Sequence, residues 1–298
     1  MTNLNFIVLG AAKAGTSWVH SCLEEHPDIF VPREKELHFF SYPENYYQGI
    51  DWYESFFQTR DCQSAVGEVC PSYLTEDSVA QKIYDYNPNI KLIAILRSPI
   101  ERAYSHYCMD LRSGLLSEDI DRELTPQNKR VRQGLYYYHI QKFLKLFEAE
   151  HIKVLLYEDL KQNPAAFIQE IYAFLKVDSN FSPSILHKRQ NQRKALPKFN
   201  TLYSYLKSVE KWINENSSYG RGIVNYMRRY GYFDSFHKLN EGQTYPQLST
   251  QAEQKLAEFY QSDLHLLEQM LERDLSFWLK PYLAQNSTRQ PESIKSST

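Results

Sequence analysis

The chain has 298 residues, with 34 Lys and Arg against 36 Asp and Glu, and carries a formal charge of −2 at pH 7. This balance argues against a general nucleic-acid binder, whose surface is strongly basic. Hydrophobic residues make up 42% of the chain and charged residues 23%. Such a composition predicts a chain that buries a large core and excludes a disordered one.

The start of the chain lacks the pattern of a targeting segment. The apolar run Phe6 to Leu9 stops at Gly10, which is too short for a signal sequence. No later apolar run approaches the roughly 20 residues of a membrane span. The four cysteines form no Cys-x-x-Cys pair. We therefore predict a soluble cytoplasmic protein with reduced cysteines and without a membrane or nucleic-acid partner.

In chain order, apolar stretches of strand length alternate with stretches of helical periodicity. Strand patterns cover residues 6–9, 65–69, 92–96 and 152–157, and helical patterns cover residues 17–25, 135–147, 164–175 and 249–271. The alternation predicts the α/β class, as a single domain with a mostly parallel central sheet flanked by helices. Ligands of such sheets lie at the carboxyl ends of the strands. We assign the domain to residues 1–283 and a polar, flexible tail to residues 284–298.

A loop of small residues follows the first predicted strand. It reads Gly-Ala-Ala-Lys-Ala-Gly-Thr-Ser from Gly10 to Ser17, with two glycines at the spacing of a phosphate-binding P-loop. Small side chains let backbone amides approach an anion, and the following helix adds the positive end of its dipole. We predict a phosphate group at Ala14, Gly15, Thr16 and Ser17.

The loop departs from that of nucleoside triphosphatases. Thr16 follows the second glycine, where those proteins carry a lysine, and Lys13 lies inside the loop instead. The strand pattern at 92–96 ends in Arg97, where a triphosphatase could place a magnesium-binding aspartate. We therefore expect a different phosphate-like donor, with Lys13 at a bridging oxygen and no metal.

A second anion site is predicted after residues 92–96. Arg97 closes that strand at the ligand edge of the sheet. Ser98 is the expected N-cap of the next helix, with Glu101 as its capping-box partner. Ser105 follows Ser98 by two helical turns on the same face. Two phosphate sites on one edge suit a nucleotide phosphorylated at both its 5′ and 3′ ends.

In these segments the chain resembles the sulfotransferases that use 3′-phosphoadenosine 5′-phosphosulfate (PAPS). The loop Gly10 to Ser17 is similar to their 5′-phosphosulfate loop, and Leu96 to Tyr107, Leu-Arg-Ser-Pro-Ile-Glu-Arg-Ala-Tyr-Ser-His-Tyr, is similar to their 3′-phosphate motif. Lys35 to Phe40 and Glu68 to Tyr73 are similar to segments of the heparan-type, carbohydrate branch, and residues 273–279 to bacterial members. The resemblance spans all but the tail and implies a P-loop-like sulfotransferase fold.

The resemblance also implies roles for individual residues. PAPS would be the co-substrate, held by the loop together with Arg97 and Ser105, without a metal. Lys13 would stabilise the departing phosphate. Glu36 would act as general base, with His38 as the competing candidate. If residues 36–38 are extended, both side chains project to one side and could form a dyad.

The expected acceptor is a hydroxyl or an amine of a sugar or a small natural product. Val69 stands where heparan-type relatives commonly have a lysine, and the chain has no long basic run, which disfavours a heavily sulfated polyanion. We predict acceptor contacts at Tyr73 and Tyr136. The aromatic residues after Glu36 supply stacking surface or belong to the core; they are Tyr42, Tyr46, Tyr47, Trp52, Tyr53, Phe56 and Phe57.

A basic loop around residue 190 falls where relatives place a segment that covers the adenosine and the 3′-phosphate. Asn191 and Arg193 are the predicted contacts, and a solvated basic loop is the alternative.

Two other functions compete with sulfuryl transfer. A P-loop kinase of small molecules would bind ATP with Mg²⁺, although Thr16 in place of the lysine counts against it. A non-catalytic nucleotide- or glycan-binding relative would bind the donor without transfer, although Lys13 and Glu36 argue against it.

Overall fold

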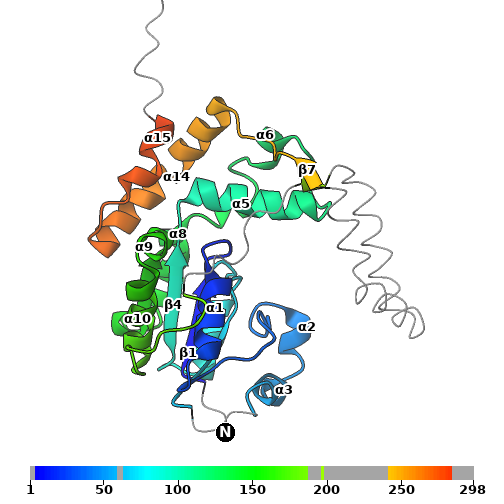
Figure 1. Ribbon diagram of the computed structural model, residues 1–298. Helices are drawn as coiled ribbons and strands as arrows, with labels where there is room; N and C mark the ends of the chain where they lie inside the picture. The colour runs from blue at the N-terminus through cyan, green and yellow to red at the C-terminus, as the bar shows by residue number, and fades with distance from the viewer. Residues whose placement is uncertain (1–3, 59–62, 187–195, 198–240, 284–298) are drawn as a thin grey trace, which may run out of the picture.

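The computed structural model describes residues 4–58, 63–186, 196–197 and 241–283 (Figure 1). Its centre is a five-stranded sheet in the order β2-β3-β1-β4-β5, and every pair of neighbours is parallel. The strands are β1 (Phe6–Gly10), β2 (Ile29–Phe30), β3 (Ala65–Val69), β4 (Lys91–Leu96) and β5 (Ile152–Leu156). The predicted α/β class with a parallel central sheet is confirmed.

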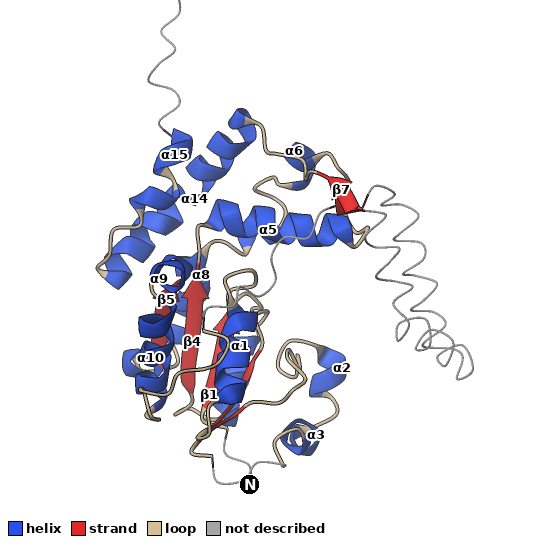
Figure 2. Ribbon diagram, in the orientation of Figure 1, coloured by secondary structure: helices blue, strands red, loops and turns tan. Residues whose placement is uncertain are grey.

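Helices surround this sheet (Figure 2). They are α1 (Thr16–Glu25), α2 (Pro43–Tyr46), α3 (Ile50–Ser55), α4 (Val79–Tyr86), α5 (Pro99–Arg112), α6 (Ile120–Glu123), α7 (Lys129–Arg132), α8 (Tyr136–Leu144), α9 (Tyr157–Gln162), α10 (Pro164–Leu175), α14 (Thr250–Leu271) and α15 (Lys280–Leu283). Short 3-10 helices cover Ala149–His151 and Ser276–Trp278, and β6 (Leu196–Pro197) pairs antiparallel with β7 (Glu241–Gln243).

The core lies on both faces of the sheet. All positions of β1 and β3, and all of β4 except Lys91, are buried, as expected for parallel strands covered on two sides. Phe6 of β1 pairs with Gly67 of β3 and with Lys91 of β4. This register brings the carboxyl ends of the central strands to one edge, and α5 lies across that edge (Figure 1).

The start of α5 differs from the prediction. Ser98 is the N-cap residue and Pro99 begins the helix, as predicted, but the Ser98 side chain makes no capping hydrogen bond. Glu101 instead accepts hydrogen bonds from Arg97 Nε at 3.1 Å and Nη2 at 2.6 Å. The capping box is therefore wrong, because a guanidinium at hydrogen-bond distance competes successfully with a neutral amide for the carboxylate.

No helix among the described residues is long and apolar enough to cross a membrane. The predicted tail, residues 284–298, lies outside the described part of the chain, as do Asn191 and Arg193.

Candidate functional site

The small-residue loop joins β1 to α1 at the edge where the strands end. Gly15 is the N-cap of α1 with φ 91° and supplies no side-chain cap. A Cβ at this position would lie 2.9 Å from Leu160 Cδ2 and 3.2 Å from Tyr157 Cδ2, so only glycine fits against α9. The amides of Thr16 and Ser17 begin the helix and have no intrahelical acceptor. The loop therefore presents amide donors and the positive end of α1 to a ligand.

Lys13 lies at the tip of this loop with φ 72°. Its Nζ donates to Met109 Sδ on α5 at 3.5 Å. Burial lowers the pKa of the Lys13 ammonium, and the charges of Lys35 and Arg97 lower it further. Asp110 and Glu36 act in the opposite direction. An anionic ligand here would offset the cost of burying the charged ammonium and would reduce the repulsion between the cations.

Arg97 connects the loop to the second predicted anion site. It follows β4, and its Nη1 donates to the carbonyl oxygen of Lys13 at 3.3 Å. The guanidinium lies over the Tyr157 ring, 4.9 Å from its centroid. Tyr136 Oη donates to the Arg97 carbonyl at 2.8 Å. The two predicted phosphate sites are thus neighbours at one sheet edge. Ser105 is half-buried on α5.

Lys35 and Glu36 approach the same edge from the loop after β2. Lys35 Nζ donates to Thr16 Oγ1 and Ser17 Oγ, both at 3.3 Å, and to Glu36 Oε1 at 2.8 Å. Lys35 therefore bridges the phosphate loop and the predicted base. The position of Lys35 next to Glu36 in the sequence indicates this ion pair, but it does not show that the side chain also reaches α1.

His38 lies beside Glu36, with Nε2 3.8 Å from Glu36 Oε2. Its Nδ1 shares hydrogen bonds with Ser72 Oγ at 3.0 Å and Ser41 Oγ at 3.3 Å. The imidazole stacks on the Tyr42 ring at 4.2 Å between centroids. Burial lowers its pKa, with Glu36 raising and Lys35 lowering that value.

The backbone that presents this pair is not the one predicted. Glu36 and His38 have φ of 67° and 55°, so the segment is not extended and the face-sharing argument is wrong. The two side chains meet because the chain turns in the left-handed region at both positions. This left-handed conformation costs free energy for a non-glycine residue, and it is kept only where contacts with the surrounding residues stabilise it.

Left-handed backbone marks this site within the described chain. Five non-glycine residues have positive φ: Lys13, Glu36, His38, Lys176 and Glu272. The last two are the C-caps of α10 and α14, where this conformation is common. The other three are the residues predicted to carry the chemistry, which is where backbone strain tends to gather.

A buried carboxylate on β3 supports the segment from beneath. Glu68 accepts a hydrogen bond from Tyr53 Oη at 2.6 Å, and burial raises the pKa of Glu68 to about 7, with the Tyr53 and Tyr73 hydroxyls and the Leu37 amide opposing that shift. Tyr73 Oη also accepts a hydrogen bond from the Phe40 amide at 3.2 Å. These contacts hold the turn that carries Glu36.

Tyr73 and Tyr136 are buried, and their hydroxyls contact backbone groups. They support the walls of the site and present no surface to an acceptor. The aromatic cluster after Glu36 divides into three groups by exposure. Tyr53 and Phe57 are buried, Trp52 and Phe56 pack partly buried against the core, and Tyr42, Tyr46 and Tyr47 are exposed.

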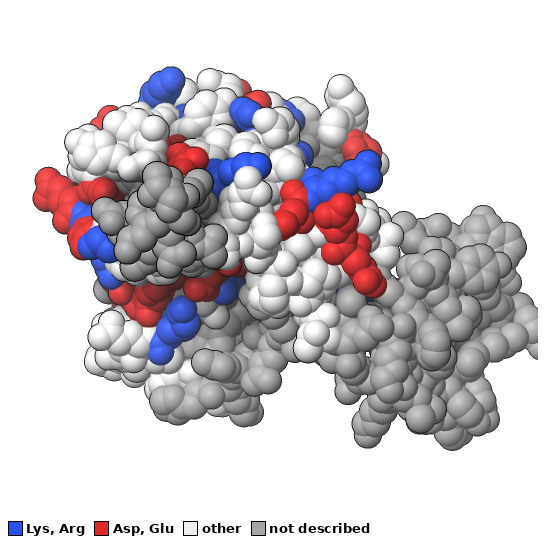
Figure 3. All heavy atoms as spheres, turned by 90° about the horizontal axis from the view of Figure 1, so that it is seen from above, with Lys and Arg blue, Asp and Glu red and all other residues white. Residues whose placement is uncertain are grey.

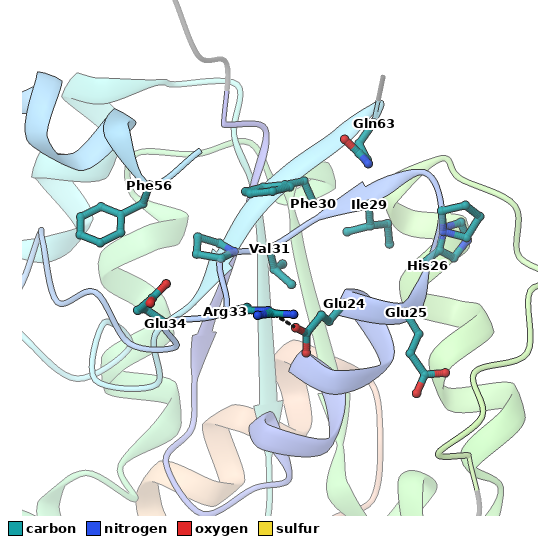
Figure 4. A pocket seen from close by; sticks show the side chains of 12 residues that line it. Glu24, Glu25, His26, Ile29, Phe30, Val31, Arg33, Glu34, Phe56 and Gln63 are labelled. Carbon is teal, nitrogen blue, oxygen red and sulfur yellow. Dashed lines mark ion pairs between the residues drawn. The ribbon is translucent and has the colours of Figure 1, made fainter. Parts of the chain in front are cut away.

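Two cavities lie away from these residues. One of about 470 Å³ opens where α1 ends and β2 begins, and there Arg33 Nε faces Glu24 Oε1 at 3.9 Å (Figure 4). It is at the opposite end of α1 from Gly15, about 15 Å away along the helix axis. A second, of about 640 Å³, lies between α8 and α14. Neither is lined by Lys13, Glu36 or Arg97.

Comparison with known proteins identifies the family. The model of the sulfotransferase domain matches residues 4–268, and the chain belongs to the sulfotransferase family. Members of this family take the sulfuryl group from PAPS. The resemblance and the co-substrate class inferred from the sequence are confirmed at this level.

Individual relatives are distant. Heparan sulfate glucosamine 3-O-sulfotransferase 5 of Mus musculus is 28% identical over 210 residues, which are 66% of this chain and 60% of that protein. Bifunctional heparan sulfate N-deacetylase/N-sulfotransferase 2 of Homo sapiens is 28% identical over 193 residues, 58% of this chain and 22% of that protein. The chain thus spans less than two thirds of these relatives. A sulfotransferase from Alicyclobacillus acidocaldarius superposes with a TM-score of 0.67 at 25% identity, over 93% of this chain and 99% of that one.

The described residues fit a donor with an anionic 5′ end. The cradle at Gly15 would be filled by a Cβ, and Lys13, Lys35 and Arg97 bring three cations to it. The group would be held by the residues 13–17 and by Arg97.

Proposed function

We propose that this chain transfers the sulfuryl group of PAPS to a hydroxyl or an amine of a sugar or a small natural product. The observation that carries the proposal is the hydrogen bond from Arg97 Nη1 to the Lys13 carbonyl at 3.3 Å. It joins the two phosphate-binding segments into one site, and Lys35 joins that site to the Glu36 carboxylate. A bisphosphorylated nucleotide with a transferable end is the ligand that this arrangement suits.

The residues divide the work of an in-line transfer. Glu36 takes the proton from the acceptor oxygen or nitrogen as that atom forms its bond to sulfur. The bond from sulfur to the bridging oxygen breaks, and its electron pair stays on that oxygen. Lys13 and the amides of the loop stabilise the charge that develops there. PAPS supplies the sulfuryl group and leaves as adenosine 3′,5′-bisphosphate.

Glu36 is favoured over His38 as the base. The Glu36 side chain is 41% exposed and that of His38 is 20% exposed, so the carboxylate has the better access to an acceptor. One imidazole nitrogen is already occupied by Ser72 and Ser41. We assign to His38 the role of orienting the Glu36 carboxylate.

The surface around the site favours a neutral acceptor. Seen from the side of α5 and α14, basic and acidic side chains alternate over the described surface rather than forming one positive field (Figure 3). Tyr42 is exposed and stacks on His38 beside the base, and aromatic faces stack well on sugar rings. The curated relatives in this comparison are named for heparan sulfate, whereas the described part of this chain offers exposed aromatic surface beside the base.

Calorimetric titration tests the donor before any acceptor is known. We expect adenosine 3′,5′-bisphosphate to bind without metal and more tightly than ATP with Mg²⁺. Arg97→Ala should weaken this binding roughly tenfold to a hundredfold, since a hydrogen bond to a charged group contributes about 1.5–3 kcal/mol. Arg122→Ala, at an exposed arginine of α6, is the matched control and should bind normally. Preference for Mg-ATP would replace this proposal with the kinase.

A further inference from the structure

Lys35 lies between the loop Gly10 to Ser17 and the predicted base Glu36, and its ammonium contacts both. Its side chain is 19% exposed and its ammonium contacts three oxygens. Two are hydroxyls of the first residues of α1, and the third belongs to Glu36. An ammonium has three donor hydrogens, so these three partners use all of them.

An anion bound at the start of α1 would compete for this ammonium. Thr16 and Ser17 lie where the helix presents its free amides, and the Lys35 Nζ is 3.3 Å from both of their hydroxyls. A phosphate oxygen there is a stronger acceptor for an ammonium than a neutral hydroxyl. The nearest carboxylate to lose its share of Lys35 would be Glu36, which is 2.8 Å away.

We propose that Lys35 is a positioning residue that couples the two substrates: the 5′-phosphate of the donor draws its ammonium toward α1, and this loosens the Lys35–Glu36 pair and frees the carboxylate for the acceptor. The inference rests on the proposed function. The coupling is reciprocal: if donor binding weakens the Lys35–Glu36 pair, then the pair weakens donor binding by the same free energy. Glu36 therefore holds back donor binding through Lys35.

Variants at these two positions should keep the fold. The Glu36 side chain is 41% exposed, and ion pairs at exposed groups contribute little to the free energy of unfolding. The neighbouring cations Lys13 and Arg97 are unchanged in all of these variants, so a loss in Lys35 variants reports on this ammonium alone.

The experiment is a double-mutant cycle read by calorimetric binding of adenosine 3′,5′-bisphosphate. Lys35→Met should weaken binding by about tenfold, and Glu36→Gln should tighten it by about threefold to tenfold, within the usual range of coupling between sites. In the Lys35→Met background, Glu36→Gln should have no effect. Lys35→Arg keeps the charge and should recover most of the affinity.

Adenosine 3′-monophosphate is the matched ligand control, because it lacks the group at α1. Neither substitution should change its binding. If the bisphosphate binds wild type but Lys35→Met binds it equally well, the inference is overturned and the proposed function stands. If Glu36→Gln changes affinity equally with and without Lys35, the coupling through Lys35 is overturned. If wild type does not bind the bisphosphate, the proposed function itself fails.

Discussion

The loop after β1 and the loop after β2 meet at one edge of the sheet but are built differently. The first passes from a buried strand directly into a regular helix, and its glycine packs against α9. The second follows a strand of two residues and turns twice through left-handed backbone. Its shape depends on single contacts to side chains, such as Asn45 Nδ2 donating to the Leu37 carbonyl at 2.8 Å.

The difference separates two kinds of requirement. An anion site needs amides and cations around a fixed cradle, which a strand, a loop and a helix supply as a unit. A base needs one carboxylate at one place, which individual contacts can set. We therefore expect substitutions in the first loop to change donor affinity and chemistry together. In the second loop we expect substitution of the Glu36 carboxylate to change chemistry with little loss of donor affinity, whereas Lys35, which reaches Thr16 and Ser17, also affects donor affinity.

The largest expected effect is in the second loop. Glu36→Gln should slow single-turnover transfer by roughly 10² to 10⁴, the usual contribution of a general base. Donor binding should not weaken, because the neutral glutamine side chain no longer competes with the donor phosphate for the Lys35 ammonium. Rapid-quench measurement with bound PAPS tests this. His38→Ala is the companion variant, and an active Glu36→Gln enzyme with an inactive His38→Ala enzyme would make His38 the base.

In the first loop, Lys13→Ala should lower the transfer rate by about 10² or more, because the leaving oxygen loses a preorganised cation. Single-turnover kinetics at saturating PAPS separate this effect from binding. The control is Lys153→Ala, which removes a lysine of β5 that is paired with Glu170 of α10. An unchanged rate in Lys13→Ala would remove Lys13 from the chemistry.

Beneath the second loop, Glu68 makes stability depend on pH. Its pKa is raised from 4.5 to about 7 in the folded chain, so between these values the folded state keeps a proton that the unfolded state has lost. The free energy of unfolding should therefore fall as pH rises through this window, by up to about 3 kcal/mol. Glu68→Gln cannot ionise and should not show this loss. Urea denaturation of both proteins at pH 5 and pH 8 measures the difference, and parallel pH profiles would contradict it.

A smaller effect is expected at the glycine of the first loop. Gly15→Ala should cost roughly 1–3 kcal/mol of stability, since alanine is strained at positive φ and its Cβ would meet Leu160 at 2.9 Å. Gly49→Ala is the matched variant, because Gly49 has φ 85° but an added Cβ there would meet no atom within 4 Å. Urea midpoints should fall further for Gly15→Ala. Equal losses would show that backbone strain alone, without the packing on α9, requires the glycine.

The regular elements could be predicted from the chain because their patterns are local. Apolar runs at 65–69 and 92–96 match β3 and β4, and the helical pattern at 164–175 matches α10. β2 has only two residues, Ile29 and Phe30, and so lacks a pattern long enough to detect. At α5 the N-cap residue Ser98 is the predicted one, but the capping box does not form because Arg97, outside the helix, binds Glu101.

The site divides in the same way. The amino-acid sequence by itself determined the strand, glycine loop and helix around Lys13, and the placement of Arg97 at the end of the next apolar strand, because the carboxyl ends of parallel strands meet at one edge. Only the tertiary structure decided that Lys35 touches Thr16 and Ser17, and that Glu36 and His38 meet through left-handed turns. Such contacts depend on irregular backbone held by distant groups, and no periodicity along the chain records them.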